Sequence, residues 1–159
     1  AALRATSLRI KADAWAEGVN AARIIGRLQQ WRSAPEVILD VAHNRQSVAQ
    51  LALWLERNPK PTRAVFCALK DKDTPAMIEV LSPFIRLWHV GVLHEPAGRC
   101  FSEQELSAVL RQCLPETAYR LHESVPAAYQ AALADTPVDQ RILVFGSFHT
   151  LEAVMRHVH

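Results

Sequence analysis

The apolar runs of this sequence are continuous rather than alternating, and segments with helical spacing separate them, which constrains the fold more than any other feature. Strands that are apolar on both faces are typical of parallel sheets covered by helices on both sides. We therefore predict an α/β fold, a three-layer sandwich around a mostly parallel sheet of about five to six strands, with helices on both faces. Strands are expected at residues 28–31, 36–42, 63–69, 85–93, 119–122 and 141–145.

The segments between these strands carry the start and stop signals of helices. Asn44 and Ser102 are good N-cap residues, and Pro75 suits the first turn of a helix. Residues 146–150 are expected to form a turn before the last helix. Helices are predicted over residues 8–24, 45–56, 74–81, 103–113, 125–134 and 151–158.

The length and charge of the chain exclude several functional classes. Its 159 residues, half of them hydrophobic, can bury one sizeable core. The net charge is only +2 and the basic residues are scattered, so we expect no nucleic-acid partner. No apolar stretch is long enough for a membrane span and no signal peptide opens the chain. The three cysteines lack metal-type spacing, Cys67 reads as a buried small hydrophobe, and a cytoplasmic location is expected.

Polar residues gather where the first strong strand ends. Asp40 and His43 directly follow the apolar run, at the end of a strand where open α/β sheets bind ligands. The carboxylate could orient a ribose, a metal-bound water or an imidazole, and the histidine could meet a phosphate. The alternative is that Asp40 ties down a loop and His43 caps the next helix. Arg27 lies thirteen residues before Asp40 and follows Gly26, so its guanidinium could fork onto a phosphate, although alone it would read as a linker residue.

Two later strand ends repeat this pattern. Lys70 and Asp71 open a run of four alternating charges, which is either an ordinary solvated loop or a substrate contact. Ser147 follows the last strand, where it could donate to a ligand oxygen near a helix amino terminus or serve as an ordinary N-cap.

Motifs that are missing limit what the chain can do alone. It contains neither of the two common glycine-rich phosphate loops, and it has only five glycines. We therefore expect no triphosphate cradle of either standard type. The remaining histidines are treated as isolated surface or core residues, and no metal site is predicted in this chain; they are His89, His94, His122, His157 and His159.

Four motif blocks, taken together, point to a known family. In order they are Gly26-Arg27-Leu28-Gln29, Leu39-Asp40-Val41-Ala42-His43-Asn44, Lys70-Asp71-Lys72-Asp73 and Gly146-Ser147-Phe148-His149-Thr150. Their order and spacing resemble the carboxyl-terminal domain of bacterial folylpolyglutamate synthase/dihydrofolate synthases, in the Mur ligase superfamily. The resemblance implies a Rossmann-like domain at residues 26–159, preceded at 1–25 by the last helix and linker of an ATPase domain.

The family implies a ligase reaction. ATP phosphorylates the carboxylate of dihydropteroate or of a folate's terminal glutamate, and the amine of L-glutamate displaces phosphate from the acyl phosphate. By resemblance Arg27 would contact the ATP phosphates and Asp40 the nucleotide. His43, the candidate catalytic residue, would lie close to the phosphates, and Ser147 near the glutamate. Lys70 and Asp71 are substrate-binding candidates.

The resemblance also implies that the remaining machinery lies elsewhere. The P-loop, the Mg²⁺ ligands and most of the pterin pocket would belong to the amino-terminal ATPase domain, so the isolated fragment is expected to be inactive. Two positions depart from the family pattern, because Arg45 and Ile25 stand where proline is usual. Two alternatives stay open: a stand-alone nucleotide- or anion-binding module, and a Mur-type ligase for a peptidoglycan precursor.

Overall fold

The six strands in the part of the chain that the structure describes form one sheet. A computed structural model describes residues 26–95 and 97–156 of the 159-residue chain. In spatial order the strands are β1-β2-β6-β3-β4-β5. Their bounds are β1 (Gln29–Ser33), β2 (Glu36–Asp40), β3 (Thr62–Phe66), β4 (Ile85–Gly91), β5 (Tyr119–His122) and β6 (Arg141–Phe145).

The sheet is parallel except at one edge. β2, β6, β3, β4 and β5 run parallel to their neighbours, whereas β1 pairs antiparallel with β2. The central strand β6 is buried along its whole length, as expected for a strand covered on both faces. The predicted mostly parallel α/β sheet of about six strands is confirmed.

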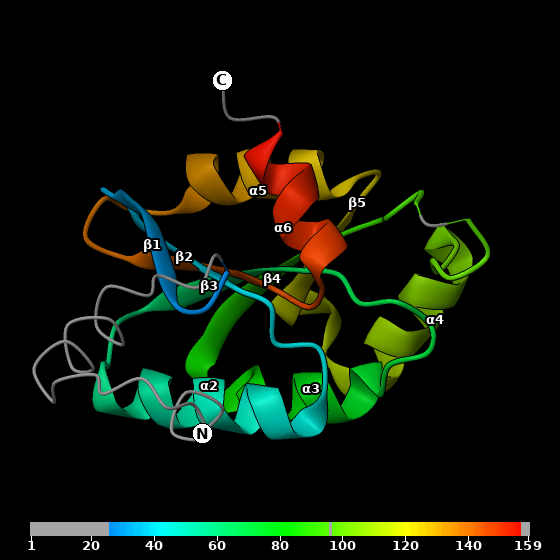
Figure 1. Cartoon of the computed structure of the whole chain (residues 1–159), viewed down its shortest axis with the longest axis horizontal. Coiled ribbons are helices and arrows are strands. Elements are labelled where there is room, and N and C mark those ends of the chain that lie inside the picture. The colour runs from blue at the N-terminus through cyan, green and yellow to red at the C-terminus, as the bar shows by residue number, and fades with distance from the viewer. Residues whose placement is uncertain (1–25, 96, 157–159) are drawn as a thin grey trace, which may run out of the picture.

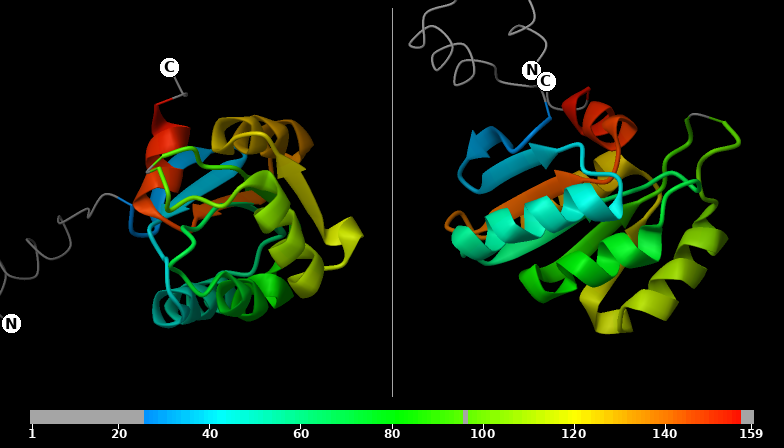
Figure 2. Two further views of the ribbon diagram at one scale, coloured as in Figure 1. Left: turned by 90° about the vertical axis from the view of Figure 1, so that its right-hand side faces the viewer. Right: turned by 60° about the horizontal axis from the view of Figure 1, so that its bottom comes forward.

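Helices cover both faces of the sheet and complete a three-layer sandwich. α2, α3 and α4 lie on one face, and α5 and α6 lie on the other (Figures 1 and 2). The predicted helix over residues 8–24 falls outside the described residues. The bounds are α2 (Arg45–Arg57), α3 (Thr74–Leu81), α4 (Glu103–Cys113), α5 (Val125–Asp135) and α6 (Phe148–Met155).

The sheet divides the core into two apolar clusters. Beneath α2, α3 and α4, the rings of Phe66 and Trp88 meet edge to face, with centroids 5.7 Å apart. Beneath α5 and α6, Tyr129 packs with Cys67, as expected for a buried cysteine. Burial raises the pKa of the Cys67 thiol to about 12, so this thiol is protonated at neutral pH.

Two of the helix starts follow the predicted caps. The Asn44 side chain accepts from the Ser47 amide at 2.9 Å, and Ser102 accepts from the Glu105 amide at 3.3 Å. The Glu105 carboxylate in turn accepts from the Ser102 amide at 2.8 Å, which completes a capping box.

The last helix begins earlier than predicted. Phe148, His149 and Thr150 were expected in a turn, but they form the first turn of α6. The reason is that Ser147 already caps the helix, since its hydroxyl accepts from the Thr150 amide at 3.1 Å.

Two histidines that we expected to be isolated lie together. In the parallel pair of β4 and β5, His122 lies two residues beyond Arg120, which is the register partner of His89. The two imidazole rings stack, with 3.2 Å between His89 Nδ1 and His122 Nε2. The sequence interval of 33 residues conceals this pair, because strand pairing creates the contact.

No helix in the part of the chain that the structure describes is both long and apolar enough to span a bilayer.

Candidate functional site

The candidate site lies at the carboxyl edge of the sheet. Asp40, Phe145 and Phe66 are register partners, so β2, β6 and β3 end on one row. The segments that follow them are bonded together, because the Gly146 amide donates to the Ala42 carbonyl at 3.0 Å and the Thr150 hydroxyl donates to the Cys67 carbonyl at 2.7 Å. The predicted polar residues after these strands therefore belong to one edge.

The Asp40 carboxylate joins two chain segments. Its Oδ2 accepts from the Leu28 amide at 2.9 Å, and its Oδ1 accepts from the Ala42 amide at 2.8 Å. Burial raises the pKa of Asp40, while these two amides and the charge of Arg27 act in the opposite direction. The sequence alternative in which Asp40 ties down a loop is thus correct about the contact, and the loop that it ties carries Arg27.

The turn that carries Arg27 is also fixed on its other side. The Gly26 carbonyl accepts from the Val41 amide at 2.7 Å, and a Cβ at Gly26 would lie 2.7 Å from the side chains of both Val41 and Leu151. Gly26 has φ +77°, and Leu28 has φ +43°, a left-handed conformation that costs an L-residue roughly 1–2 kcal/mol. Glycine adopts a positive φ freely, so only Leu28 is in a disfavoured conformation, and packing and hydrogen bonds hold the turn on both sides of Arg27.

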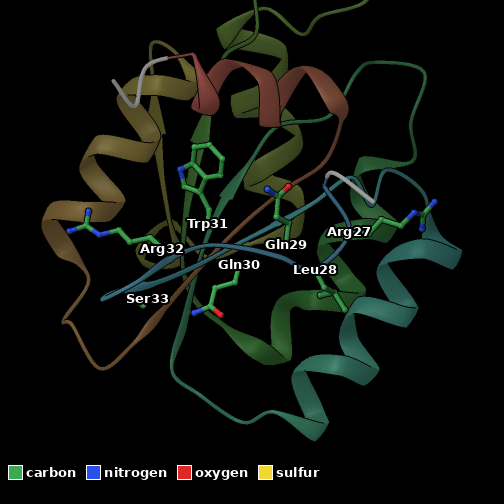
Figure 3. Close-up of a pocket in the computed structure, with 7 residues that line it drawn as sticks. All are labelled: Arg27, Leu28, Gln29, Gln30, Trp31, Arg32 and Ser33. Carbon is green, nitrogen blue, oxygen red and sulfur yellow. The ribbon is translucent and has the colours of Figure 1, made fainter. Parts of the chain in front are cut away.

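The Arg27 side chain is exposed at one end of β1. A cavity of about 610 Å³ runs along β1 and is lined by residues 27–33. Figure 3 shows Arg27 and Arg32 pointing toward opposite ends of the strand. The guanidinium of Arg27 is thus presented on a rigid turn, where a phosphate could accept from two of its N–H groups.

The His43 ring is oriented by the backbone of its own segment. Its Nδ1 lies 2.9 Å from the Val41 carbonyl oxygen, which can only accept, so Nδ1 carries the proton and Nε2 is the nitrogen left for a ligand. His43 is half-buried and does not cap α2, because Asn44 fills that position. The sequence alternative of a capping histidine is therefore wrong.

Ser147 is held within the fold. It is 5% exposed, and its hydroxyl lies 2.8 Å from that of Thr150 as well as accepting from the Thr150 amide. These contacts are those of an N-cap, the plainer of the two interpretations of the sequence. A contact between Ser147 and a ligand stays a prediction.

Lys70 and Asp71 are paired toward α4 and the loop before it. Lys70 Nζ lies 2.7 Å from Glu105, and Asp71 accepts from Arg99 at 2.9 Å and lies 3.1 Å from Lys72. Hydrogen bonds from Lys70 and Ser102 lower the pKa of Glu105 to about 2. Hydrogen bonds from Lys72 and Arg99 likewise lower the pKa of Asp71. These charges form an exposed network, and their role in substrate binding stays a prediction.

Sequence reasoning missed a second part of this edge. Two cavities of about 780 Å³ each lie beyond the ends of β4 and β5 and share His94, Glu123 and Ser124 among their lining residues. Lys70 lines one of them, and His149 of α6 lines the other. The same rule that led to Asp40, polar residues directly after a strand, would have found Glu123 and Ser124 after β5.

The chemistry of the edge suits an anion more than a metal. Arg27 offers N–H donors and is positioned by the turn between Gly26 and Leu28, whereas Nε2 of His43 becomes a donor only when the ring is protonated. Within residues 26–95 and 97–156, no group of three or more His, Cys, Asp or Glu side chains is placed to hold a metal ion.

Comparison with known proteins adds a family and several relatives. The family described as "Mur ligase, glutamate ligase domain" matches residues 26–148. The dihydrofolate synthase/folylpolyglutamate synthase of Escherichia coli K12 is 34% identical over 158 residues, which is 98% of this chain and 35% of that protein. The Haemophilus influenzae protein of the same name is 33% identical over 121 residues, 74% of this chain and 27% of that protein. The chain thus spans about a third of the length of these curated relatives.

Solved structures agree with these matches. E. coli FolC in complex with DHPP and ADP superposes with a TM-score of 0.85 at 32% identity, over 98% of this chain and 36% of that one. The Yersinia pestis bifunctional folylpolyglutamate synthase/dihydrofolate synthase with Mn, AMPPNP and L-glutamate bound superposes with a TM-score of 0.86 at 31% identity. The match covers 99% of this chain and 37% of that one. The expected Rossmann-like fold and the predicted resemblance are both confirmed.

Proposed function

The chain belongs to the Mur ligase family, as a glutamate ligase domain, and from this premise we propose that it is the carboxyl-terminal domain of an ATP-dependent carboxylate–amine ligase. In the proposed reaction a carboxylate receives a phosphoryl group from ATP, and the amine of L-glutamate then displaces phosphate to form an amide. The carboxylate is that of dihydropteroate, of a folate, or of both. The relatives support this choice, because they are dihydrofolate and folylpolyglutamate synthases whose structures hold ADP, DHPP or L-glutamate.

The observation that carries the proposal is that Arg27, Asp40 and His43 share one rigid piece of the carboxyl edge. The Leu28 and Val41 amides bond the turn and the end of β2 to each other, so the three side chains are held in a fixed relation. Arg27 would pair with phosphate oxygens, where negative charge builds up during transfer. His43 would donate from Nε2 to a phosphate oxygen when its ring is protonated, since Nδ1–H is committed to Val41.

The domain would work together with a second one. We propose that residues 26–159 are the carboxyl-terminal domain and that residues 1–25 are the end and linker of an ATPase domain, which would supply the P-loop and the Mg²⁺ ligands. The greater length of the relatives supports this division. Closure of the two domains would align the reactants and exclude water, which is where most of the rate enhancement would arise. A cytoplasmic location is part of the proposal, since the reaction consumes ATP.

The test is the ligase activity of the full-length enzyme that carries Arg27→Ala, with dihydropteroate, L-glutamate and MgATP. Loss of a charge-stabilising contact should lower turnover about 10²–10³-fold. Arg32→Ala is the matched control, because Arg32 is an exposed arginine of the adjoining strand β1 and points the other way (Figure 3).

Unchanged turnover in Arg27→Ala would overturn the proposed phosphate contact. Activity of the unaltered enzyme on a nucleotide-linked muramyl peptide, and none on dihydropteroate or folates, would instead identify another Mur-type ligase. Saturable ATP binding without any amide formation would identify a nucleotide-binding module.

A further inference from the structure

The Asp40 carboxylate is directed at the protein backbone on both of its oxygens. Oδ2 accepts from Leu28, twelve residues earlier in the chain, and Oδ1 accepts from Ala42, two residues later. The carboxylate has further acceptor sites for a ligand, but these two bonds tie its position to the backbone. The longer-range bond is the informative one, because it crosses from the end of β2 to the turn before β1.

The position of Arg27 depends on that turn. Arg27 lies between two bonded points: the Gly26 carbonyl accepts from Val41 at 2.7 Å, and the Leu28 amide donates to Asp40 at 2.9 Å. Leu28 adopts a positive φ that its side chain disfavours, so this conformation persists only while other contacts hold it. The bond to Asp40 is the direct restraint on the Leu28 amide.

We propose that Asp40 is a positioning residue: its carboxylate locks the turn from Gly26 to Leu28 and so fixes the Arg27 guanidinium at the carboxyl edge. This inference rests on the proposed function, in which Arg27 contacts a phosphate. It assigns Asp40 an action through Arg27, and this leaves room for a contact between the same carboxylate and the nucleotide, because each oxygen can accept more than one hydrogen bond. The benefit is alignment, since a group held in the reactive geometry before the reaction contributes more to the rate than a mobile one.

A double-mutant cycle in the full-length enzyme separates positioning from direct contact. Asp40→Asn keeps the shape of the side chain but replaces one acceptor oxygen with an NH₂ donor that cannot accept from a backbone amide. We expect it to lower kcat/KM about 10²-fold, the size of the loss that follows a misplacement of about 1 Å. In the Arg27→Ala background the same change should lower kcat/KM much less than it does in the unaltered enzyme, because the part of the loss that acts through Arg27 is already gone.

Gly26→Ala tests the same turn with Asp40 and Arg27 both present. The added Cβ would lie 2.7 Å from the side chains of Val41 and Leu151, which is too close, so the turn would have to move away from them. We expect a loss of kcat/KM similar to that of Asp40→Asn, and again a much smaller loss in the Arg27→Ala background. Asp139→Asn, at an exposed aspartate, is the control for the loss of one carboxylate.

A third measurement does not depend on activity. In Asp40→Asn, hydrogen exchange of the Leu28 amide should accelerate at least about tenfold, while amides in the central strand β6 keep their protection. Because this measures the restraint itself, it separates failure of the inference from failure of the proposed function.

The outcomes are distinct. Additive losses in the cycle would show that Asp40 acts independently of Arg27 and would overturn the inference. Unchanged exchange at Leu28 would also overturn it, as would a variant that melts at lower temperature yet keeps its kcat/KM. If Arg27→Ala is fully active while Leu28 exchange rises in Asp40→Asn, the turn is locked as described but the phosphate contact of the proposed function is wrong.

Discussion

The Nε of Arg141 donates a hydrogen bond to the Glu36 carboxylate at 2.6 Å, across the parallel pair of β6 and β2 in which the two residues are register partners. The Arg141 side chain is only 5% exposed. Its guanidinium also donates to the Asn58 carbonyl at 2.9 Å and lies 4.6 Å from the centroid of the Trp54 ring. A buried cation at the amino end of the central strand is therefore satisfied by groups from β2 and from the carboxyl end of α2.

Glu36→Ala should lower the free energy of unfolding by about 3 kcal/mol, because it leaves the Arg141 charge buried without its counter-ion. We take the lower end of the range for a broken buried pair, since the Glu36 side chain is 21% exposed. Chemical denaturation measures the change. The double variant Glu36→Ala/Arg141→Met should recover most of the loss, because an apolar side chain of similar length needs no partner. A single-variant loss near zero would contradict this account.

Gly146→Ala should destabilise the protein much more than Gly98→Ala, although both glycines have positive φ. A Cβ at Gly146 would lie 2.1 Å from the Cys67 carbonyl oxygen, whereas a Cβ at Gly98 would meet nothing within 4 Å. Gly146→Ala should lower the free energy of unfolding by about 3 kcal/mol or more, because backbone strain and overpacking act together. Gly98→Ala should cost about 1 kcal/mol, from backbone strain alone. Equal thermal midpoints for the two variants would show that the close approach is unimportant.

The sequence predicts the layers of this fold well and its polar contacts poorly, and residues 141–145 show why. Continuous apolar runs reveal a buried parallel strand, because burial on both faces leaves a local signature. The burial of Arg141 leaves no such signature. Its counter-ion, Glu36, is 105 residues away, and strand order alone brings the two together. His89 and His122 became neighbours for the same reason.

The candidate site shows the same difference between features that a local pattern predicts and contacts between distant parts of the sequence. The position of Asp40 at a strand end could be predicted, since the rule that ligands bind there depends only on local pattern. Its bond to Leu28 could not, because it requires the chain to return antiparallel along β1. The interpretation of Ser147 as an N-cap is confirmed, although the helix was predicted to begin only at residue 151, and only the structure shows its hydroxyl engaged by Thr150.

His43→Asn and His43→Gln should differ in the full-length enzyme. Asparagine can place an amide near the position of Nδ1 and keep the Val41 contact, but it has nothing near Nε2, so turnover should fall about 10²-fold. Glutamine extends an NH₂ group toward the position of Nε2 and should retain more activity if the histidine donates to a phosphate. Steady-state turnover at saturating MgATP decides between them. Equal losses in both variants would contradict a donor role at Nε2 and favour a role in accepting a proton.

The paired histidines should make the fold sensitive to mild acid. His89 is fully buried, with Nδ1 3.2 Å from His122 and Nε2 3.7 Å from Asp135. Burial and the neighbouring His122 lower the pKa of His89 to about 4, with Arg120 and Arg63 acting in the same direction and Asp135 against it. Burial and Arg120 also lower the pKa of His122.

The sign of the effect follows from proton uptake. An unfolded histidine gains its proton near pH 6.5. The native His89 gains its proton only near pH 4, so the unfolded state binds more protons between these values and stability falls as the pH falls. The loss across this window should be roughly 2–3 kcal/mol for a fully buried group. Denaturation midpoints at pH 7, 5.5 and 4.5 measure it. His89→Gln should flatten the profile, whereas His94→Gln, at an exposed histidine, should leave it unchanged. If His89→Gln keeps the full acid sensitivity, then other groups titrate in this window and the buried pair does not govern it.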